Sequence, residues 1–338
     1  MTSESLAAGR VLPEALSRWN TRVEEEVRRL ALPPTTQLGQ MAAYHLGWVD
    51  VDGRPAGTGG GKRLRPSLCL WAAAACGAEP ERALPVAAAI ELIHNFTLVH
   101  DDIQDGDLLR RGRPTVWSVW GQAQGINAGD GLFALAVRSA LSCPEAAGVL
   151  VDATIEVIEG QCLDLQHEGR LDGSLQAYFR LVEAKTGALF GASLEAGAVV
   201  AGATPEVRRK LQQAGRLLGT AFQLRDDWLG VWGDPDLTGK SRDGDLERRK
   251  LGYPVVAAHA AADESRRREL ERLYETEGGG AATRIRRLLE ELGGAAATAS
   301  APMERAAEAV AVIEDCAFAG ERTQEFVDVA HHVAERSR

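Results

Sequence analysis

Lysine is scarce in this chain of 338 residues, which carries 38 basic side chains but only five lysines. Lysine and arginine serve about equally well on a solvated surface. A chain that has almost abandoned lysine should therefore retain it only where a compact point charge matters. The five lysines are Lys62, Lys185, Lys210, Lys240 and Lys250.

Features that define several other protein classes are also absent. The five cysteines are scattered and form no CxxC pair, which favours reduced, buried thiols in a cytoplasmic protein. No stretch approaches the roughly 18 uninterrupted apolar residues that a membrane span needs. The N-terminus also lacks the charged and apolar regions of a secretory signal. The net charge of -10 argues against a protein that coats nucleic acid.

Helical periodicity extends through most of the chain, whereas β-branched runs are scarce and alanine is abundant. Gly and Pro clusters separate the helical stretches, and no cluster is a long linker between domains. We therefore expect one all-α domain over residues 1–338, with a disordered segment at 1–10 and a mobile loop at 50–59. Helices are predicted at about 13–30, 62–76, 82–104, 128–141, 144–166, 174–200 and 205–231, with a further set between 253 and 338.

An acidic cluster closes the apolar helix predicted at 82–104. Asp101 and Asp105 are four residues apart, so they share one helix face and repel each other unless something neutralises them. Carboxylate oxygens are ligands of Mg²⁺, which bridges protein carboxylates to substrate phosphates. A solvated acidic helix end is the alternative explanation. The run Arg110-Arg111-Gly112-Arg113 that follows favours metal and phosphate binding.

A second acidic pair, Asp226-Asp227, lies near the end of the helix predicted at 205–231. A Gly-rich loop with Lys240 follows it. Either acidic cluster by itself could be a solvated helix end. Two facing clusters, each flanked by basic residues, could hold several Mg²⁺ ions with a diphosphate as the shared ligand.

The basic residues suggest anion sites. Lys62 and Arg65 share a helix face just after a Gly-rich loop, and a helix N-terminus with two cations attracts anions. The segment lacks the spacing of a Walker motif, and no strand precedes it. Lys185 lies within an apolar helical stretch, where a lone lysine is usually a surface residue with a buried stem. Lys250 follows Arg248-Arg249.

Six segments in this order resemble the trans-isoprenyl diphosphate synthase (polyprenyl synthetase) family: GGKRLRP, HNFTLVHDDIQD, LLRRGRPT, KTGALF, FQLRDDWLGVWGDP with a later TGK, and K followed by YPV. The resemblance runs from about Gly60 to Val255. It implies a single large helical bundle of the isoprenoid synthase type around a central cleft, and a homodimer. It also implies condensation of isopentenyl diphosphate with dimethylallyl, geranyl or farnesyl diphosphate, giving all-trans farnesyl or geranylgeranyl diphosphate.

The resemblance also implies roles for individual residues. Mg²⁺, as three ions with substrate bound, would be held by Asp101, Asp105 and Asp226, with Asp102 in support. The isopentenyl diphosphate would be bound by Lys62, Arg65, His94 and Arg111. The allylic diphosphate would be bound by Arg110, Lys185 and Lys240. Thr186 and Gln223 would line the allylic carbon, and Lys250 would lie near a closing loop. Four of the five lysines thus fall within these motifs, and Lys210 remains an ordinary surface residue.

Two positions bear on how this chain differs within the family. The second aspartate motif often has a third Asp, but Gly230 stands there, and Asp234 or water could compensate. Phe96 lies five residues before Asp101, roughly 7.5 Å further along the helix at 1.5 Å per residue. With Thr97 it is the candidate floor for the growing isoprenoid tail. The alternative explanation is that Phe96 is an ordinary residue of the hydrophobic core.

Two other functions remain open at this stage. A class I terpene cyclase would share Asp101 and a Mg²⁺ cluster. It would usually carry a second motif of Asn or Asp, Ser or Thr, and Glu, and it has no use for a second diphosphate pocket at Lys62 and Arg65. A non-catalytic subunit of a heteromeric prenyl synthase would be expected to lose metal carboxylates, whereas Asp101, Asp105 and Asp226 are retained.

Overall fold

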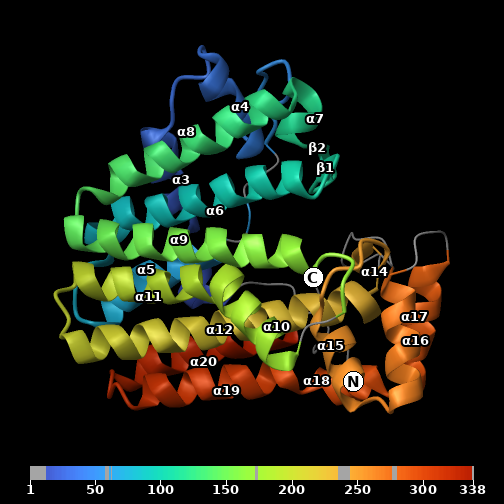
Figure 1. Cartoon of the computed structure of the whole chain (residues 1–338). Coiled ribbons are helices and arrows are strands. Elements are labelled where there is room, and N and C mark those ends of the chain that lie inside the picture. The colour runs from blue at the N-terminus through green and yellow to red at the C-terminus, as the bar shows by residue number, and fades with distance from the viewer. Residues whose placement is uncertain are drawn as a thin grey trace. The chain divides into compact units, whose positions relative to one another are not determined.

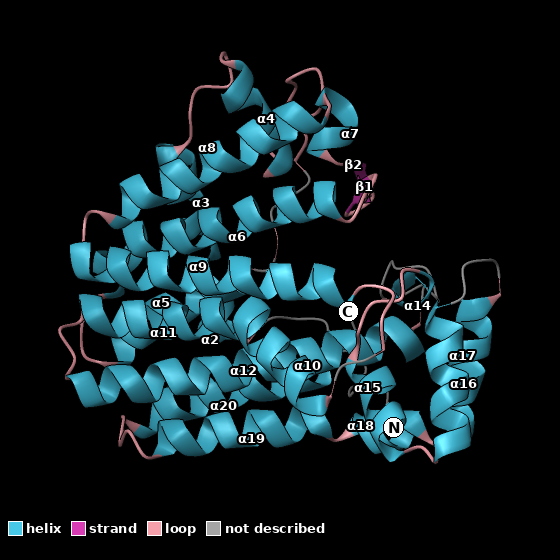
Figure 2. Cartoon of the chain, in the orientation of Figure 1, coloured by secondary structure: helices cyan, strands magenta, loops and turns pink. Residues whose placement is uncertain are grey.

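The computed structural model of the chain describes residues 13–57, 61, 63–171, 174–234, 244–275 and 280–336. Helices make up nearly all regular structure in these residues, and the only sheet there is a short hairpin (Figure 2). The predicted all-α class is therefore confirmed. The residues group into two compact units, described separately below. An N-terminal unit comprises Glu14–Thr154 and Ala192–Gln212, and a C-terminal unit comprises Ile155–Gly191 and the described part of Gln213–Arg338.

Helix α6 (Leu84–Gln104) is the central helix of the N-terminal unit (Figure 1). It packs most extensively against α8 (Gln122–Ala140), and also against α5 and α3. Apolar residues cover almost its whole circumference, as is typical of a helix buried on all sides. The other elements of the unit are α2 (Glu14–Ser17), α3 (Asn20–Leu30), α4 (Gln37–His45), α5 (Leu64–Ala75), η1 (Pro80–Ala83), β1 (Leu109–Arg110), β2 (Arg113–Pro114) and α7 (Val116–Trp120).

A glycine on α8 sets the position of a histidine on α6. A Cβ on Gly129 would overlap the imidazole of His100, so only glycine leaves room for this ring between the two helices. His100 in turn stacks edge-on against Phe96, with ring centroids 4.9 Å apart. The close approach of α8 thus fixes the surroundings of the last two turns of α6.

The C-terminal unit is built on the second half of α12 (Pro205–Trp232). Its core gathers Leu224, Val255, Leu270 and Tyr274, all fully buried. Helices α9 (Pro144–His167) and α11 (Ala188–Val200), like α12, contribute residues to both units. The remaining elements are α10 (Leu175–Val182), the π-helical turn η2 (Glu183–Gly187), α14 (Gly244–Glu247), α15 (Tyr253–Ala261), α16 (Glu264–Glu275), α17 (Ala281–Glu291), α18 (Gly294–Ala299), α19 (Ala301–Glu314) and α20 (Gly320–Glu335).

The predicted helices differ from the observed ones in a few places. The helix expected at 13–30 is two helices, α2 and α3, and at the break the Leu16 carbonyl accepts a hydrogen bond from Ser67 Oγ at 3.0 Å. A tertiary contact of this kind leaves no trace in the periodicity. Helix α4 was not predicted, although Thr36 caps it by accepting from Gly39 N at 3.1 Å, and a threonine before a helix is a usual start signal.

Three other expectations can be compared with the structure. All five cysteines are free, but only Cys69 is buried, and Cys162 is exposed, so the prediction of buried thiols was wrong for most of them. The stretch 80–104 is long and apolar enough by composition to cross a membrane. Most of its apolar window is buried within the protein, as in a core helix. The described part of the 50–59 loop is a hydrogen-bonded turn, in which Asp50 accepts from the backbone of Asp52 and Arg54.

Candidate active site

The first aspartate motif divides its carboxylates between two faces of α6. Asp101 lies in the last turn and Asp105 caps the helix, its backbone N donating to Asp101 O at 2.8 Å. Both side chains are partly exposed. Asp102, one residue on, faces the interior and is only 1% exposed. The spacing of four thus leaves Asp101 and Asp105 on the face that solvent and a cation can reach.

Asp102 anchors an arginine of the β1–β2 hairpin. Arg110 Nε donates to Asp102 Oδ1 at 2.7 Å. Burial raises the pKa of Asp102 to about 6, and the facing Arg110 guanidinium opposes that rise. The Asp102 carboxylate therefore holds Arg110 in place. Its contribution to a metal site would be indirect, through the position of this arginine.

Arginines surround a neutral histidine in the N-terminal unit. Arg65 Nη1 approaches His94 Nε2 at 3.4 Å, so this ring nitrogen is the acceptor. The pKa of His94 is lowered well below its usual 6.5, first by burial and then by Arg65, Arg111 and Arg110. A Cβ on Gly61 would lie 2.8 Å from Arg111 Nη2, so the backbone at Gly61 passes close to this guanidinium. The structure thus brings Arg65, His94 and Arg111, predicted for one diphosphate, close to Arg110, predicted for the other.

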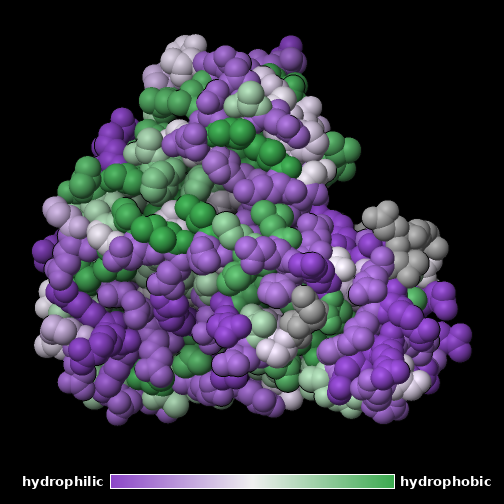
Figure 3. Space-filling view, viewed as in Figure 1, coloured by the Kyte–Doolittle hydropathy of each residue, from purple (hydrophilic) through white to green (hydrophobic). Residues whose placement is uncertain are grey.

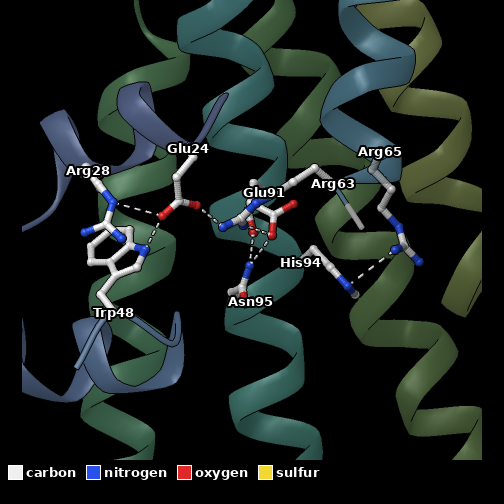
Figure 4. A network of polar contacts seen from close by, with 8 residues as sticks. All are labelled: Glu24, Arg28, Trp48, Arg63, Arg65, Glu91, His94 and Asn95. Carbon is white, nitrogen blue, oxygen red and sulfur yellow. Dashed lines mark hydrogen bonds and ion pairs between the residues drawn. The ribbon is translucent and has the colours of Figure 1, made fainter. Parts of the chain in front are cut away.

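A buried ionic network holds the segment that carries Arg65 (Figure 4). Arg63, two residues earlier, has a left-handed backbone with φ of 52° and turns inward. Its guanidinium donates to Glu91 on α6 and to Glu24 on α3. Asn95 also donates to Glu91, at 2.8 Å. Arg63 is held by Glu91 and Glu24, whereas Arg65, two residues later, points toward His94 (Figure 4).

Lowering the pH should destabilise the protein through His45 and His94. Burial and nearby arginines lower the pKa of His45 to about 3 and that of His94 well below 6.5. The arginines are Arg110 and Arg111 for both rings, with Arg113 acting on His45 and Arg65 on His94. Both imidazoles are therefore neutral in the folded protein.

Unfolded imidazoles take up protons near pH 6.5. The free energy of unfolding is thus at its full value above that pH and declines as the pH falls below it. Each histidine should contribute a loss of about 1.4 kcal/mol for each pH unit below 6.5, measured by urea unfolding between pH 7 and 5. The raised pKa values of Asp102 and Asp227, both about 6, oppose this loss below pH 6, so the histidine contribution is the difference in slope between the wild type and a variant without the two imidazoles. A His45→Gln/His94→Gln variant should lose this slope. An equal slope in both proteins would contradict the explanation.

The second aspartate motif lies near the end of α12 in the C-terminal unit. Asp226 is partly exposed, at 34%, and its Oδ1 accepts from Arg336 Nη2 at 3.1 Å. The guanidinium of Arg336 also lies 3.8 Å over the ring of Phe222. Arg225 Nε donates to the Arg336 carbonyl at 2.8 Å. The guanidinium of Arg336, at the end of α20, thus already pairs with the Asp226 carboxylate, which was predicted to bind a metal.

Asp227 organises the interior of the C-terminal unit. Its Oδ2 accepts from Tyr178 Oη at 2.6 Å and from Tyr253 N at 2.8 Å, and its Oδ1 accepts from Gln223 Nε2 at 2.8 Å. Gln223 Oε1 then accepts from Thr186 Oγ1 at 3.0 Å. Burial raises the pKa of Asp227 to about 6. Asp227 therefore positions two of the predicted substrate-lining residues, Gln223 and Thr186.

Lys185 belongs to the π-helical turn η2 and pairs with Asp164 on α9. Gly160, one turn earlier on α9, leaves no room for a Cβ against the Lys185 backbone. π-helical turns inside helices are frequent at functional sites. The carboxylate orients the ammonium, so Lys185 is not the solvated surface residue that its apolar surroundings would otherwise suggest.

The remaining predicted residues lie in different situations. Phe96 is buried and packs on Phe133, with ring centroids 5.3 Å apart, while Thr97 Oγ1 donates to the His94 carbonyl at 2.8 Å. The backbone carbonyl of Lys250 accepts from Tyr274 at 3.0 Å. Lys62 and Lys240 lie outside the described residues.

The donor set of the two motifs fits Mg²⁺. Within the described residues, no group of three or more His, Cys, Asp or Glu side chains is gathered closely enough to hold a metal by itself. Mg²⁺ usually takes one or two protein carboxylates and completes its shell with water and substrate phosphates. Asp101 and Asp105 on one helix face match that demand, and so does Asp226, which already attracts a guanidinium.

Comparisons with known proteins agree with this geometry. A family model described as polyprenyl synthetase matches residues 56–292. The (2E,6E)-farnesyl diphosphate synthase of Mycobacterium tuberculosis is 39% identical over 92% of this chain and 89% of its own length. The geranylgeranyl diphosphate synthase of the same organism is 42% identical over 82% of each chain. Among solved structures, a polyprenyl synthetase from Streptomyces coelicolor A3(2) has a TM-score of 0.87 and 37% identity, covering 94% of this chain and 98% of that one.

The helical fold, the two aspartate motifs and these likenesses define a trans-prenyltransferase of the isoprenoid synthase class. The family model covers well over half of the residues, and the relatives align along most of their length. The chain belongs to the polyprenyl synthetase family.

Several residues of the site escaped the sequence analysis. Arg63, Glu91, Asp164 and Arg336 each hold a predicted residue or its segment in place. Their partners lie 28, 21 and 110 positions away in sequence, so no local pattern pairs them. Only Glu91 carried a signal, because a carboxylate in the middle of an apolar helix requires a partner.

Proposed function

We propose that this chain condenses isopentenyl diphosphate with dimethylallyl, geranyl or farnesyl diphosphate, giving all-trans farnesyl or geranylgeranyl diphosphate in a Mg²⁺-dependent reaction. The curated relatives bear the names of farnesyl and geranylgeranyl diphosphate synthases. The proposal extends those activities to this chain, and the residues of each unit support it independently.

The observation that carries the proposal is the arginine cluster around neutral His94. Three guanidiniums, those of Arg65, Arg110 and Arg111, act on one imidazole, and Asp102 is the acidic group that faces Arg110. Glu91 and Asp102 also act on Arg111, but three guanidiniums around one neutral ring favour a further anion, and a diphosphate supplies one. We assign this cluster, with Lys62, to isopentenyl diphosphate. A cyclase would have no second diphosphate to place there.

The allylic diphosphate is assigned to Lys185 and Lys240, with Arg110 as a third cation. Asp164 orients the Lys185 ammonium, and Thr186 and Gln223 form a hydrogen-bonded pair beside it. We assign this pair to the allylic carbon, where a hydroxyl and an amide dipole can face developing positive charge. Lys250 is assigned to the closing loop.

Asp101, Asp105 and Asp226 would hold Mg²⁺, with Asp102 in support through Arg110. When bound, Mg²⁺ supplies positive charge that stabilises the departing diphosphate. Lys185 adds a fixed ammonium to the same task. These acidic and basic groups are needed together, because the diphosphate carries several negative charges and the carboxylates alone would repel it.

The reaction breaks the bond between the allylic C1 and its diphosphate oxygen, whose electron pair leaves with the diphosphate. The isopentenyl double bond then donates its electron pair to C1, forming the new carbon–carbon bond, and a proton is lost from the adjacent carbon. The buried apolar face of α6 would keep water from the intermediate cation. We assign no side chain as the base, and the released diphosphate can accept the proton.

Replacing Phe96 by Ala should lengthen the product. The ring is buried on α6, five residues before Asp101, and stacks on His100 and Phe133, so it closes the path of a tail that runs along the helix. We expect the main product to gain at least one five-carbon unit, measured by chromatography of the dephosphorylated alcohols. Phe179→Ala, which removes an aromatic ring from α10, is the control and should leave product length unchanged. An unchanged distribution for Phe96→Ala would show that Phe96 is not the floor.

The assay that tests the proposed function is incubation with isopentenyl diphosphate and each allylic primer, with and without Mg²⁺, followed by sizing of the products. Prenyl diphosphates formed only with Mg²⁺ would support it. A hydrocarbon formed from the allylic diphosphate alone would indicate a terpene cyclase. Inactivity that a partner chain restores would indicate a non-catalytic subunit.

We also propose that the enzyme is a cytoplasmic homodimer. Free cysteines, one of them exposed, suit a reducing compartment. Exposed apolar residues lie on one face of α9, at spacings of four, three and seven: Val151, Ile155, Ile158 and Leu165. Hydrophobic surface is visible along this helix in Figure 3, and a second copy of the chain would cover it. Sedimentation velocity tests the dimer by its mass.

A further inference from the structure

Gly230, where the family often has a third aspartate, is covered by another carboxylate. A Cβ built on Gly230 would overlap Asp245 Oδ2 and lie 3.2 Å from Asp245 Cγ. The Asp245 side chain therefore occupies the space that a side chain at position 230 would take. The sequence analysis did not single out Asp245.

The position of Asp245 is fixed by its own short helix. Leu246, the next residue of α14, is buried at 2% exposure, and Asp245 O accepts from Lys250 N at 3.0 Å. Tyr274 then donates to the Lys250 carbonyl at 3.0 Å. The charges of Asp245 and Asp227 both act on the Tyr274 hydroxyl, so Asp245 lies close to the second aspartate motif.

The location of this carboxylate on α12 relates it to Asp226. Position 230 follows Asp226 by four residues, so a group lying over Gly230 is on the same helix face, about 6 Å along the axis. Asp226 already binds the guanidinium of Arg336, which is buried against Phe222. The Arg336 guanidinium therefore shows, independently of Asp245, that this helix face attracts positive charge.

We propose that Asp245 serves as the second carboxylate of the metal site at Asp226, in place of the aspartate missing from position 230. The inference rests on the proposed function, which assigns Mg²⁺ to Asp226. In this chain the acidic face of the second motif is thus divided between α12 and α14. Gly230 and Asp245 are complementary, because an aspartate at 230 would collide with the one at 245.

The test measures metal binding rather than turnover. Mn²⁺ binding to the full chain, in the presence of inorganic diphosphate, is followed by electron paramagnetic resonance. We expect Asp245→Asn to weaken Mn²⁺ binding by about 10- to 100-fold, as for other supporting groups of metal sites. Glu247→Gln removes an exposed carboxylate from the same helix and should leave the affinity within about twofold. Thermal unfolding checks that both variants are folded.

A reciprocal exchange makes the test specific. Gly230→Asp alone should destabilise the protein, because two carboxylates compete for one space. Gly230→Asp with Asp245→Gly returns one carboxylate to that space and should recover Mn²⁺ affinity to within a few-fold of the wild type. An unchanged affinity in Asp245→Asn would overturn the inference, and so would a double variant no better than Asp245→Gly alone.

Asp101→Ala separates this inference from the proposed function. If Asp101→Ala weakens Mn²⁺ binding and Asp245→Asn does not, the inference fails while the metal assignment stands. If the wild-type protein binds no Mn²⁺ with diphosphate and forms no prenyl diphosphate, the proposed function fails, and the inference fails with it.

Discussion

Replacing Asp101 by Ala lowers the rate of prenyl transfer on the order of 10³-fold, if Asp101 carries the metal that stabilises the leaving diphosphate. Asp101 lies on the accessible face of α6 with Asp105, whereas Asp102 is committed to Arg110. Loss of the one carboxylate removes a ligand and leaves the Asp102–Arg110 pair intact. The measurement is the initial rate of product formation at saturating primer and Mg²⁺.

The fold should not change with Asp101→Ala, because the side chain is partly exposed. We expect the free energy of unfolding to stay within about 0.5 kcal/mol of the wild type. Glu206→Ala, on the exposed first turn of α12, is the control and should keep full activity. Full activity of Asp101→Ala would remove Asp101 from the metal site. Low activity with a large loss of stability would mean that Asp101 acts on the fold.

Replacing Glu91 by Ala should cost about 3–5 kcal/mol of stability, since it removes the more deeply buried of the two carboxylates that pair with the buried charge of Arg63. Arg63 and Glu91 have side chains only 4% and 5% exposed, and Asn95 donates to the same Glu91 oxygen (Figure 4). After the substitution, Arg63 retains Glu24, which is 26% exposed, as its remaining partner. Urea unfolding at pH 7.5 measures the loss.

The exposed pair Arg22–Glu81 provides the matched control for Glu91. Its side chains are 55% and 43% exposed, so Glu81→Ala should cost less than about 1 kcal/mol. Replacing both Arg63 and Glu91 by apolar residues of similar size should recover much of the stability, because no charge is then left unpaired. A loss for Glu91→Ala no larger than that for Glu81→Ala would show that the network contributes little.

The same network also affects the site. Arg63 fixes the segment that carries Arg65, and Arg65 lies against His94 (Figure 4). Glu91→Ala should therefore raise the KM for isopentenyl diphosphate more than the KM for the allylic primer. This selectivity follows from the location of the network, whose described contacts join α3, α6 and the segments around Trp48 and Arg63 within the N-terminal unit.

Most of the helical fold could be predicted from the sequence, because helix periodicity and helix ends are local properties. Helices α6, α9 and α12 were predicted to within two residues at each end. The break between α2 and α3 was not predicted, and the contact made there, from Ser67 to the Leu16 carbonyl, joins residues 51 positions apart. The identity of the charged residues also pointed to diphosphates, because retained lysines and paired aspartates are unusual in an arginine-rich, apolar helical chain.

Only the tertiary structure decided which neighbouring charges act together. Asp101 and Asp102 are adjacent, as are Asp226 and Asp227, yet Asp101 and Asp226 are partly exposed, whereas Asp102 is buried against Arg110 and Asp227 is held by several hydrogen bonds. Sequence determined that carboxylates, lysines and arginines occur at these positions on helices. Their division into accessible ligands and buried anchors depends on partners brought in by packing, such as Arg110 for Asp102 and Tyr178 for Asp227. The same applies to Gly230, whose missing carboxylate is replaced in space by Asp245, because three-dimensional packing, unlike a helix repeat, can join residues at any separation.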